Sequence, residues 1–381
     1  MRRGLVAAAL AVLVSAAVVS AAIAKPAAVA SPAQAECTDV SLGFLGPLTG
    51  GAAFIGNEQL SWLRFAIQKY NAARNTNFDV ALGDTQLKAP VARTRARAFV
   101  SNADVMAVIG GSESQAVRVS GNLFETANLA SISGSATAVD LTKGKPYRTF
   151  FRVVPNDAIQ GPTIVRYVAG KLRAKNVVVI DSQDDYSLPL ARAVGGGLRA
   201  RNVTVSRESV SADDTDFSSI VANIGGNVDV VVFATQTATA ANTLSNQLRE
   251  QGKRAIVFGT DGSYSPSEFK PRSGYVSAFA PDLHTVRSAR AIVREYNRFS
   301  KNRTFGTFGP PTYMAGWVAM DAIRKACANG SASRAEVTRL VRGTNLSSIT
   351  GGRTRFDAKG DLFGGGVFTV FKVTNGKYTV A

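Results

Sequence analysis

The chain has 381 residues, 45% of them hydrophobic and 19% charged, which is more than one hydrophobic core usually holds. Lysine and arginine number 44 against 27 aspartate and glutamate residues, which gives a net charge of +17. The basic residues are scattered and form no dense run with interleaved aromatic residues, so a solvated basic surface is favoured over nucleic-acid binding.

The first 35 residues have the layout of a secretory signal peptide. Arg2 and Arg3 precede an uninterrupted apolar stretch over 5–24, and small-residue cleavage sites follow that end at Ala24 and Ala35. We expect cleavage after Ala35, because a strand-like segment begins soon afterwards. The alternative is an uncleaved membrane anchor, since the apolar stretch is nearly long enough to span a bilayer.

Export to the periplasm or to the outer face of the cell membrane follows from a signal peptide over 1–35. A lipid anchor is disfavoured, because Glu36 and not a small residue precedes Cys37. Removing 1–35 leaves 346 residues with 41 lysine and arginine residues and a net charge of +14. This length predicts two lobes.

Short runs rich in valine and isoleucine recur along the rest of the chain, and each predicts a β-strand. They are almost continuously apolar, as in parallel strands that are buried on both faces. The predicted strands are 40–45, 78–82, 105–109, 177–180, 203–205, 228–233 and 255–258.

Apolar residues between these runs recur at helical spacing. The clearest series are Leu60-Leu63-Ile67-Tyr70 and Leu190-Val194-Leu198. Strands that alternate with helices predict a doubly wound α/β architecture, and the similar rhythm of the two halves fits two α/β lobes.

Cys37 and Cys327 are the two cysteines of the chain. An even count in an exported protein predicts one disulfide. Cys37 lies just before the first predicted strand, and Cys327 ends a helix whose apolar face carries Met320 and Ile323. A strand start and a helix end lie at the same end of an α/β layer, so the two cysteines are expected to meet. The alternative is two separate buried thiols.

The sequence carries no recognisable set of catalytic residues. His284 is the single histidine, and no nucleophile motif accompanies it, so we expect it on a surface loop. One histidine and two bridged cysteines disfavour a transition-metal site. Gly195-Gly196-Gly197 lies within a helical pattern and lacks the spacing of a dinucleotide fingerprint. We therefore expect no enzyme activity, no metal and no cofactor.

Three predicted strand ends carry loops that suit a small ligand: Gly110–Gln115, Ser133–Thr137 and Gly259–Gly262. The first two combine glycines and hydroxyl side chains with a helix start, where exposed backbone N–H groups favour an anion such as a carboxylate. The third offers Asp261 to a cation. Together they match a zwitterion.

A purely structural interpretation of these loops is equally open on composition and spacing. Ser114 and Thr137 would then be helix N-caps, and Asp261 a turn residue.

The chain also resembles the periplasmic solute-binding proteins of branched-chain amino acid ABC transporters, the leucine/isoleucine/valine-binding family. The resemblance runs through nearly all of the chain after the signal peptide, and the order and spacing of its motifs make it specific. The matching motifs are Gly46-Pro47-Leu48-Thr49-Gly50, Gly56, Asp84-Thr85-Gln86, Gln160-Gly161-Pro162, Asp185-Tyr186, Asp216-Phe217-Ser218 and Phe356-Asp357-Ala358-Lys359-Gly360-Asp361.

The resemblance implies two lobes, joined by three crossovers, that close on a ligand. We expect the crossovers near Pro155, Pro281 and Asp357. Each lobe is then discontinuous in sequence. The first lobe is expected to combine 36–155 with 282–357, and the second 156–281 with 358–381.

The resemblance also implies a ligand site. Ser114 corresponds to the hydroxyl that holds the ligand carboxylate, Ser135 supplies backbone groups, and Thr137 supplies a second hydroxyl. Asp261 lies where an acid receives the ligand ammonium. Tyr186 lies where an aromatic side chain of the second lobe closes the cleft.

Three positions depart from the family pattern. Asp261 replaces a longer glutamate, Gln236 stands where an aromatic residue is common, and Ile55 replaces another aromatic. The pocket for the ligand side chain is therefore altered. A buried glutamine needs a polar partner, which a ligand can supply.

The sequence thus predicts an exported receptor, not an enzyme, that binds a small polar solute such as an amino acid and delivers it to the membrane permease of an ABC transporter. The alternatives are a ligand-sensing module for a signalling partner, a binder of a carboxylate or amide other than an amino acid, and an enzyme that uses carboxylates in the cleft.

Overall fold

The computed structural model describes Met1 and residues 34–37, 40–301 and 304–381. The predicted signal peptide lies outside these residues, apart from Met1, Gln34 and Ala35. Within the described ranges, no helix has both the length and the apolarity needed to cross a membrane.

The first of two large sheets has five parallel strands in the order β3-β2-β4-β5-β6. The strands are β2 (Ser41–Gly46), β3 (Asp79–Asp84), β4 (Val105–Gly110), β5 (Ala130–Ser133) and β6 (Phe150–Arg152). Helices α1 (Ala53–Arg74) and α9 (Gly309–Ala326) pack together on one face, and α2 (Ala89–Ser101) and α3 (Ser114–Thr126) on the other.

Successive apolar side chains of each strand enter the cores on the two opposite faces of this sheet. Leu42 and Phe44 join the core under α1 and α9, while Leu45 joins the core under α2 and α3. Successive side chains of a strand point to opposite faces, so a continuously apolar strand must be covered twice.

The second sheet has seven strands in the order β16-β15-β11-β10-β9-β7-β8. They are β7 (Asn176–Asp181), β8 (Thr204–Ser209), β9 (Val230–Ala234), β10 (Ile256–Gly259), β11 (Gly274–Ala278), β15 (Thr369–Thr374) and β16 (Lys377–Val380). Strands β7 to β11 are parallel, whereas β15 and β16 pair antiparallel.

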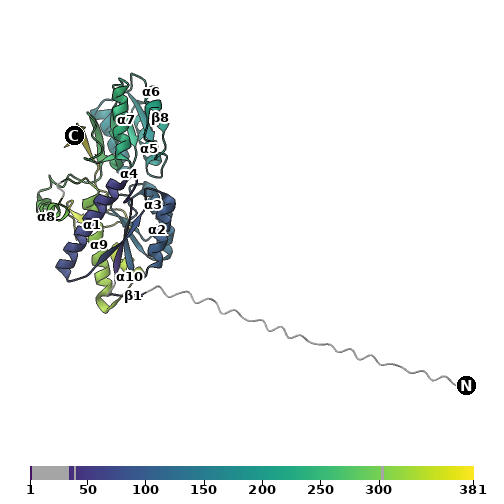
Figure 1. Cartoon of the computed structure of the whole chain (residues 1–381), viewed down its shortest axis with the longest axis vertical. Coiled ribbons are helices and arrows are strands. Elements are labelled where there is room, and N and C mark those ends of the chain that lie inside the picture. Colours follow the sequence, from purple (N-terminus) through teal and green to yellow (C-terminus); the bar gives the residue numbers. More distant parts are fainter. Residues whose placement is uncertain (2–33, 38–39, 302–303) are drawn as a thin grey trace. The chain divides into compact units, whose positions relative to one another are not determined.

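Helices cover this second sheet on both faces as well. Helix α4 (Asp157–Arg166) and α5 (Ser187–Arg199) lie on one side, and α6 (Ser218–Asn223) and α7 (Ala238–Glu250) on the other. Figure 1 shows α5, α6 and α7 around the strands of this sheet, and α1, α9 and α10 beside the first sheet.

Shorter elements complete the described part of the chain. They are β1 (Gln34–Glu36), η1 (Val139–Leu141), η2 (Tyr167–Lys171), η3 (Asp261–Ser263), η4 (Arg287–Ala289), α8 (Arg290–Ser300), η5 (Cys327–Asn329), β12 (Ser331–Ser333), α10 (Arg334–Arg342), β13 (Leu346–Ser347) and β14 (Arg353–Thr354).

The predicted doubly wound α/β architecture is confirmed, and each of the seven predicted strands occurs within a few residues of its expected place. The antiparallel pair β15–β16 at one edge was not predicted. The chain passes from β6 in the first sheet to α4 on the second, returns after β11 to α8 and α9, and ends in the second sheet at β16. The lobe boundaries near Pro155, Pro281 and Asp357 stay a prediction.

The predicted disulfide is present. Cys37 and Cys327 are bonded, with Cα atoms 5.8 Å apart and 290 positions between them in the sequence. Cys327 directly follows α9, as the sequence predicted. Next to the bridge, β1 pairs antiparallel with β12, so Gln34 and Ala35 form part of a ladder that cleavage after Ala35 would remove.

The disulfide closes a long loop and should contribute strongly to stability. We expect the double variant Cys37→Ser, Cys327→Ser to lose on the order of 4 kcal/mol of unfolding free energy, because the unfolded chain regains the entropy of the open loop. Urea unfolding of both proteins measures the difference, and adding reductant to the variant serves as the control. Equal stability of variant and parent would contradict the prediction.

Candidate functional site

Both sheets reverse their strand order at one point. In the first sheet β2 lies between β3 and β4, and in the second β7 lies between β8 and β9. The loops after strands on either side of such a point run in opposite directions and leave a crevice at the carboxyl edge of the sheet, where ligands bind in open α/β sheets. The site is therefore expected in the loops after β2, β4, β7 and β9.

These loops meet around a small cavity of about 10 Å³. Its lining comes from both lobes: Ile55, Ser112, Glu113, Ser114, Ser135, Tyr186, Gln236, Asp261, Gly262 and Phe308. Six of the seven predicted ligand-binding residues are in this set, and Thr137 is buried nearby without lining the cavity. This volume admits at most one water molecule. An amino acid would enter only if the lobes or the lining side chains moved apart.

Ser114 begins α3, but it does not cap that helix. The N-cap position belongs to Glu113, and the Ser114 hydroxyl instead accepts a hydrogen bond from the Ala138 backbone N–H at 3.3 Å. Thr137 likewise is not an N-cap, because Ala138 takes that position in front of η1. The helix-cap interpretation of these two hydroxyls is wrong.

The Ser135 side chain ties two loops of the first lobe together. Its hydroxyl donates to the Ser112 carbonyl at 2.6 Å and accepts from the Gln59 amide at 2.9 Å. Gln59 lies on α1 and is 1% exposed, and its side-chain oxygen has no hydrogen-bond partner. A buried amide oxygen without a partner costs free energy.

Asp261 forms the acidic wall on the side of the second lobe. It begins η3, as a turn residue would, but its carboxyl is buried and accepts hydrogen bonds from the Tyr186 hydroxyl at 2.7 Å and from the Gln160 amide at 2.6 Å. Burial raises the pKa of Asp261 to about 6, and these hydrogen bonds limit the rise. Asp261 therefore stays mainly ionised at neutral pH.

Gly262 lets two loops of the second lobe pack closely beside the cavity. A Cβ atom at this position would lie 2.5 Å from the Thr235 carbonyl oxygen and 2.9 Å from the Cα atom of Gln236. No side chain fits into that space. Glycine is thus required at position 262, because the loop after β9 approaches its backbone too closely for a side chain.

Polar contacts bridge the two lobes at the edge of the cavity. The Gln115 amide donates to the side-chain oxygen of Gln236 at 2.9 Å, which supplies the polar partner that a buried glutamine needs. Arg118 on α3 lies 3.1 Å from the Asp185 carboxylate of the second lobe and 2.5 Å from Asp140 of its own lobe.

Comparisons with known proteins agree with this geometry. A model of the periplasmic binding protein family matches residues 39–377. The chain belongs to this family. The resemblance inferred from the sequence motifs is thereby confirmed.

The relatives of this periplasmic binding protein match over most of their length. The Leu/Ile/Val/Thr-binding protein of Salmonella typhimurium strain LT2 is 26% identical over 334 residues, which cover 86% of this chain and 89% of the relative. A leucine binding protein from Thermotoga maritima has a similar structure, with a TM-score of 0.80 and 22% identity over 90% of this chain and 97% of its own. A branched-chain amino acid transporter substrate-binding protein from Streptococcus pneumoniae was solved in complex with isoleucine. Its structure gives a TM-score of 0.77 and 24% identity, over 90% of this chain and 99% of its own.

The sequence interpretation missed a second buried acid of this binding protein. Asp157 begins α4, is 5% exposed, and neither of its carboxyl oxygens has a hydrogen-bond partner. Burial raises the pKa of Asp157 to about 8, and the negative charge of Asp261 adds to the rise. The Thr137 hydroxyl approaches closely enough to lower this pKa without meeting hydrogen-bond geometry.

A third acid lines the cavity itself. Glu113 is 1% exposed and accepts a hydrogen bond from the Thr85 hydroxyl through one carboxyl oxygen, while the other oxygen has no partner. Burial raises the pKa of Glu113 to about 7. Phe308, also missed, lines the cavity beside Ile55. Glu113 lies in the loop Gly110–Gln115 that the sequence singled out, but no pattern there marked its carboxyl as buried. Phe308 directly precedes α9, far along the chain, and had no signal in the sequence.

Arg152 is a buried cation whose charge lowers the pKa of Asp157, and other groups already occupy its donors. Its guanidinium contacts Asp361 at 2.5 Å, the Thr142 hydroxyl at 2.5 Å and the carbonyls of Ala136 and Ala138 at 3.1 and 2.9 Å. The carboxyls of Asp157, Asp261 and Glu113 therefore form no ion pair with it.

His284 lies in the loop between β11 and α8, exposed as predicted, with its ring stacked on Phe305 at 4.6 Å. Within the ranges described above, no group of three or more histidine, cysteine, aspartate or glutamate side chains could hold a metal ion.

The raised pKa of Asp157 predicts an unusual dependence of stability on pH. Because its pKa rises from 3.8 to about 8 on folding, the native state holds a proton that the unfolded state releases, and stability falls as the pH rises between these values. The variant Asp157→Asn removes that cost. We expect it to be more stable than the parent by about 2 kcal/mol near pH 9, with a much smaller difference near pH 4.

Urea unfolding at both pH values measures this effect. Asp213→Asn, at an exposed position, is the matched control and should show no such difference. A gain from Asp157→Asn that is the same at both pH values would contradict the raised pKa.

Proposed function

We propose that this periplasmic binding protein is the exported receptor of an ABC importer and that it binds a small zwitterion, an amino acid, in the cleft between its two lobes. The observation that carries the proposal is the convergence of hydroxyl, amide and acid side chains from both lobes on one small cavity. A hydroxyl-lined wall faces an acidic wall across this space, which is the arrangement that a carboxylate and an ammonium on one molecule require.

Each end of the ligand has its own set of groups in this proposal. Ser114, Ser135 and Thr137, with the backbone N–H groups near them, receive the carboxylate, because hydroxyl and amide donors at the start of a helix favour an anion. Asp261 receives the ammonium. Tyr186 then covers the ligand from the side of the second lobe.

The ligand side chain would lie near Gln236 and Ile55, which line the cavity. The second acid near the ammonium end supports a cationic group on the ligand, because Asp157 and Asp261 repel each other when both are ionised. An ammonium between them would offset that repulsion. A simple carboxylate ligand would receive no such compensation.

The names of the relatives support amino acid binding, since the Salmonella relative is a Leu/Ile/Val/Thr-binding protein. The secretory layout of 1–35 supports export to the periplasm or the outer membrane face. The partner that receives the solute is then a membrane permease. No chemistry on the ligand is part of this role, so the protein is proposed not to be an enzyme.

The lobes proposed to close on the ligand are 36–155 with 282–357 and 156–281 with 358–381. A cavity of about 10 Å³ cannot take an amino acid without opening, so binding must involve movement of the lobes or of the lining side chains. The three crossovers proposed near Pro155, Pro281 and Asp357 supply the hinge.

The function is tested first by the ligand itself. Protein purified without added solute, denatured and read by mass spectrometry, should release an amino acid, and thermal shift assays with the standard L-amino acids should raise its melting temperature for a small subset. A protein that releases none and responds to none of them would refute the amino acid assignment.

We expect the lobes to close when the ligand binds. Small-angle scattering should show a smaller radius of gyration with the best amino acid of the screen at saturation than without it, because the clamp excludes solvent from the cleft. The variant Asp261→Ala, measured at the same ligand concentration, should not contract. An unchanged radius in the parent protein would contradict the clamp.

Affinity should depend more on Asp261 than on Ser114. Asp261→Ala leaves the ligand ammonium buried without its partner and should weaken binding by roughly 2–5 kcal/mol, a thousandfold or so. Ser114→Ala should cost about 1–3 kcal/mol, since backbone N–H donors remain. Titration calorimetry gives the order, with Asp213→Ala as an exposed control. Parent-like affinity of Asp261→Ala would mean that the ligand carries no ammonium at this end.

A further inference from the structure

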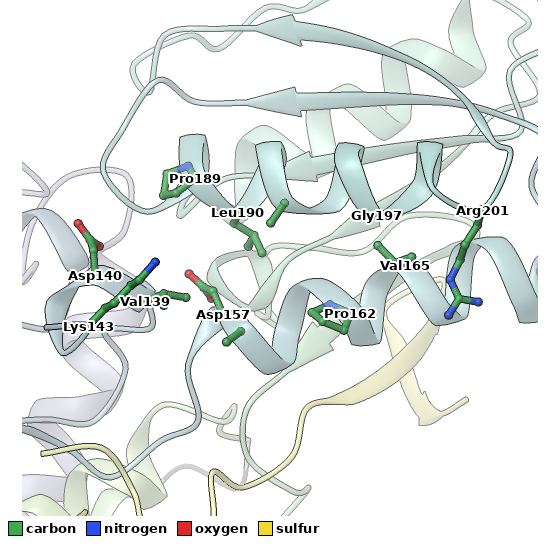
Figure 2. A pocket seen from close by; sticks show the side chains of 12 residues that line it. Val139, Asp140, Lys143, Asp157, Pro162, Val165, Pro189, Leu190, Gly197 and Arg201 are labelled. Carbon is green, nitrogen blue, oxygen red and sulfur yellow. The ribbon is translucent and has the colours of Figure 1, made fainter. Parts of the chain in front are cut away.

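The cleft contains more acidic side chains than the ammonium of one amino acid requires. Asp261 receives that ammonium in the proposed function, and the charge of Asp261 raises the pKa of Asp157, after the larger effect of burial. Figure 2 shows Asp157 on the first turn of α4, at one end of a groove between α4 and α5. These two acids belong to the ammonium end of the ligand. Glu113, the third buried acid, has no role there.

Glu113 lies in the loop after β4, on the other side of the cavity from Asp261. It is the N-cap residue of α3, but its side chain forms no capping hydrogen bond with that helix. One carboxyl oxygen instead accepts a hydrogen bond from the Thr85 hydroxyl, which follows β3. The other oxygen has no hydrogen-bond partner, although Glu113 is 1% exposed and lines the cavity. The wall of the cavity thus includes an incompletely paired carboxyl.

A buried carboxyl in this state is best satisfied by a positive charge. Burial raises the pKa of Glu113 to about 7, the Thr85 hydroxyl limits the rise, and the negative charge of Asp84 adds to it. A cation beside the carboxyl would favour its ionised form and would supply the missing hydrogen bond.

The protein itself does not supply this cation. Among the described residues, the lining of the cavity includes no lysine, arginine or histidine. The donors of Arg152 are bound to other groups of its own network. Arg118, at the edge of the cleft, pairs with Asp140 and Asp185. The positive charge that Glu113 lacks is therefore expected on the ligand.

The two ends of an amino acid leave Glu113 without a partner. The ammonium pairs with Asp261, and the carboxylate is received by Ser114, which directly follows Glu113 in the chain. An ionised Glu113 repels that carboxylate, and a second positive group on the ligand offsets the repulsion.

Apolar residues of the same cavity fit the rest of such a ligand. Ile55 and Phe308 line it together with Glu113. The hydrocarbon part of a basic side chain packs on apolar surface while its charged end reaches a carboxylate. An aliphatic side chain would use the apolar surface and leave the Glu113 carboxyl unpaired, which is costly for a buried acid.

We propose that Glu113 determines the specificity of the cleft and that the ligand is a basic amino acid, such as ornithine, lysine or arginine, whose side-chain cation contacts this carboxyl. The inference rests on the proposed amino acid receptor function and names the class of amino acid.

The test compares basic amino acids with neutral ones of nearly the same shape. Titration calorimetry on the dialysed protein measures lysine against norleucine and ornithine against norvaline, which lack the side-chain ammonium. It also measures arginine against citrulline, in which a neutral urea group replaces the guanidinium. The tightest ligand should be one of the three basic amino acids, with an affinity at least about tenfold above that of its neutral counterpart.

Substitutions of Glu113 show whether this residue is responsible. Glu113→Gln keeps the size of the side chain and removes its charge, so it should weaken the best basic ligand at least about tenfold and change the neutral counterpart less than about threefold. Glu113→Leu should bind the neutral counterpart more tightly than the basic ligand, and this gain also shows that the variant is folded. Glu208→Gln, at an exposed position on β8, is the matched control and should bind like the parent.

Two results would overturn this inference and leave the receptor function intact. One is a neutral amino acid, leucine included, that binds the parent as tightly as the best basic one. The other is parent-like affinity of Glu113→Gln for the best basic ligand, which would mean that another group receives the cation. A parent protein that binds no amino acid at all would refute the receptor function, and this inference with it.

Discussion

The buried guanidinium of Arg152 fixes the geometry on which the candidate ligand site depends. It has no exposed side-chain surface, and it binds Asp361, Thr142 and the carbonyls of Ala136 and Ala138. One side chain thereby joins the end of β6, the loop that carries Ser135 and Thr137, and the late segment around Asp361 that leads to the second sheet. Removing one partner of a buried ion pair typically costs 3–5 kcal/mol, so these three segments are held as a unit. A movement of the segments that link the two sheets would therefore also displace the loop that faces the ligand.

The acids of the cleft have no such ion pair. The donors of Arg152 are bound to Asp361, Thr142 and two carbonyls, and burial raises the pKa values of Asp157, Asp261 and Glu113 to about 8, 6 and 7. Such a group of buried acids lowers the free energy of unfolding and is suited to binding a positively charged group. Binding proteins commonly have sites that lower the free energy of unfolding, while the surrounding core stays well packed.

The sequence predicted what is encoded locally and missed what depends on distant partners. Val/Ile-rich runs such as 228–233 were found, because a parallel strand buried on both faces must be apolar throughout. Strand β6 was missed because three residues give no period, and β11 because Gly274 and Ser277 interrupt its apolar pattern. Ser114 and Asp261 were found because they follow strand ends. Asp157 was not found, because its pKa is raised by burial and by the charge of Asp261, and no local sequence pattern shows that the start of α4 is buried beside that residue.

The route of the chain through the two sheets also sets the order in which they can form as the polypeptide is made. The core under α1 and α9 draws residues from Val40 to Val341, and Cys37 must meet Cys327. Strands β7 to β11 and their four helices occupy one continuous stretch, 157–278. During synthesis from the N-terminus, the later sheet can therefore be covered on both faces while the earlier one still lacks α9. The first strand to leave the ribosome would be among the last to be buried, and its exposed apolar face would need shielding until then.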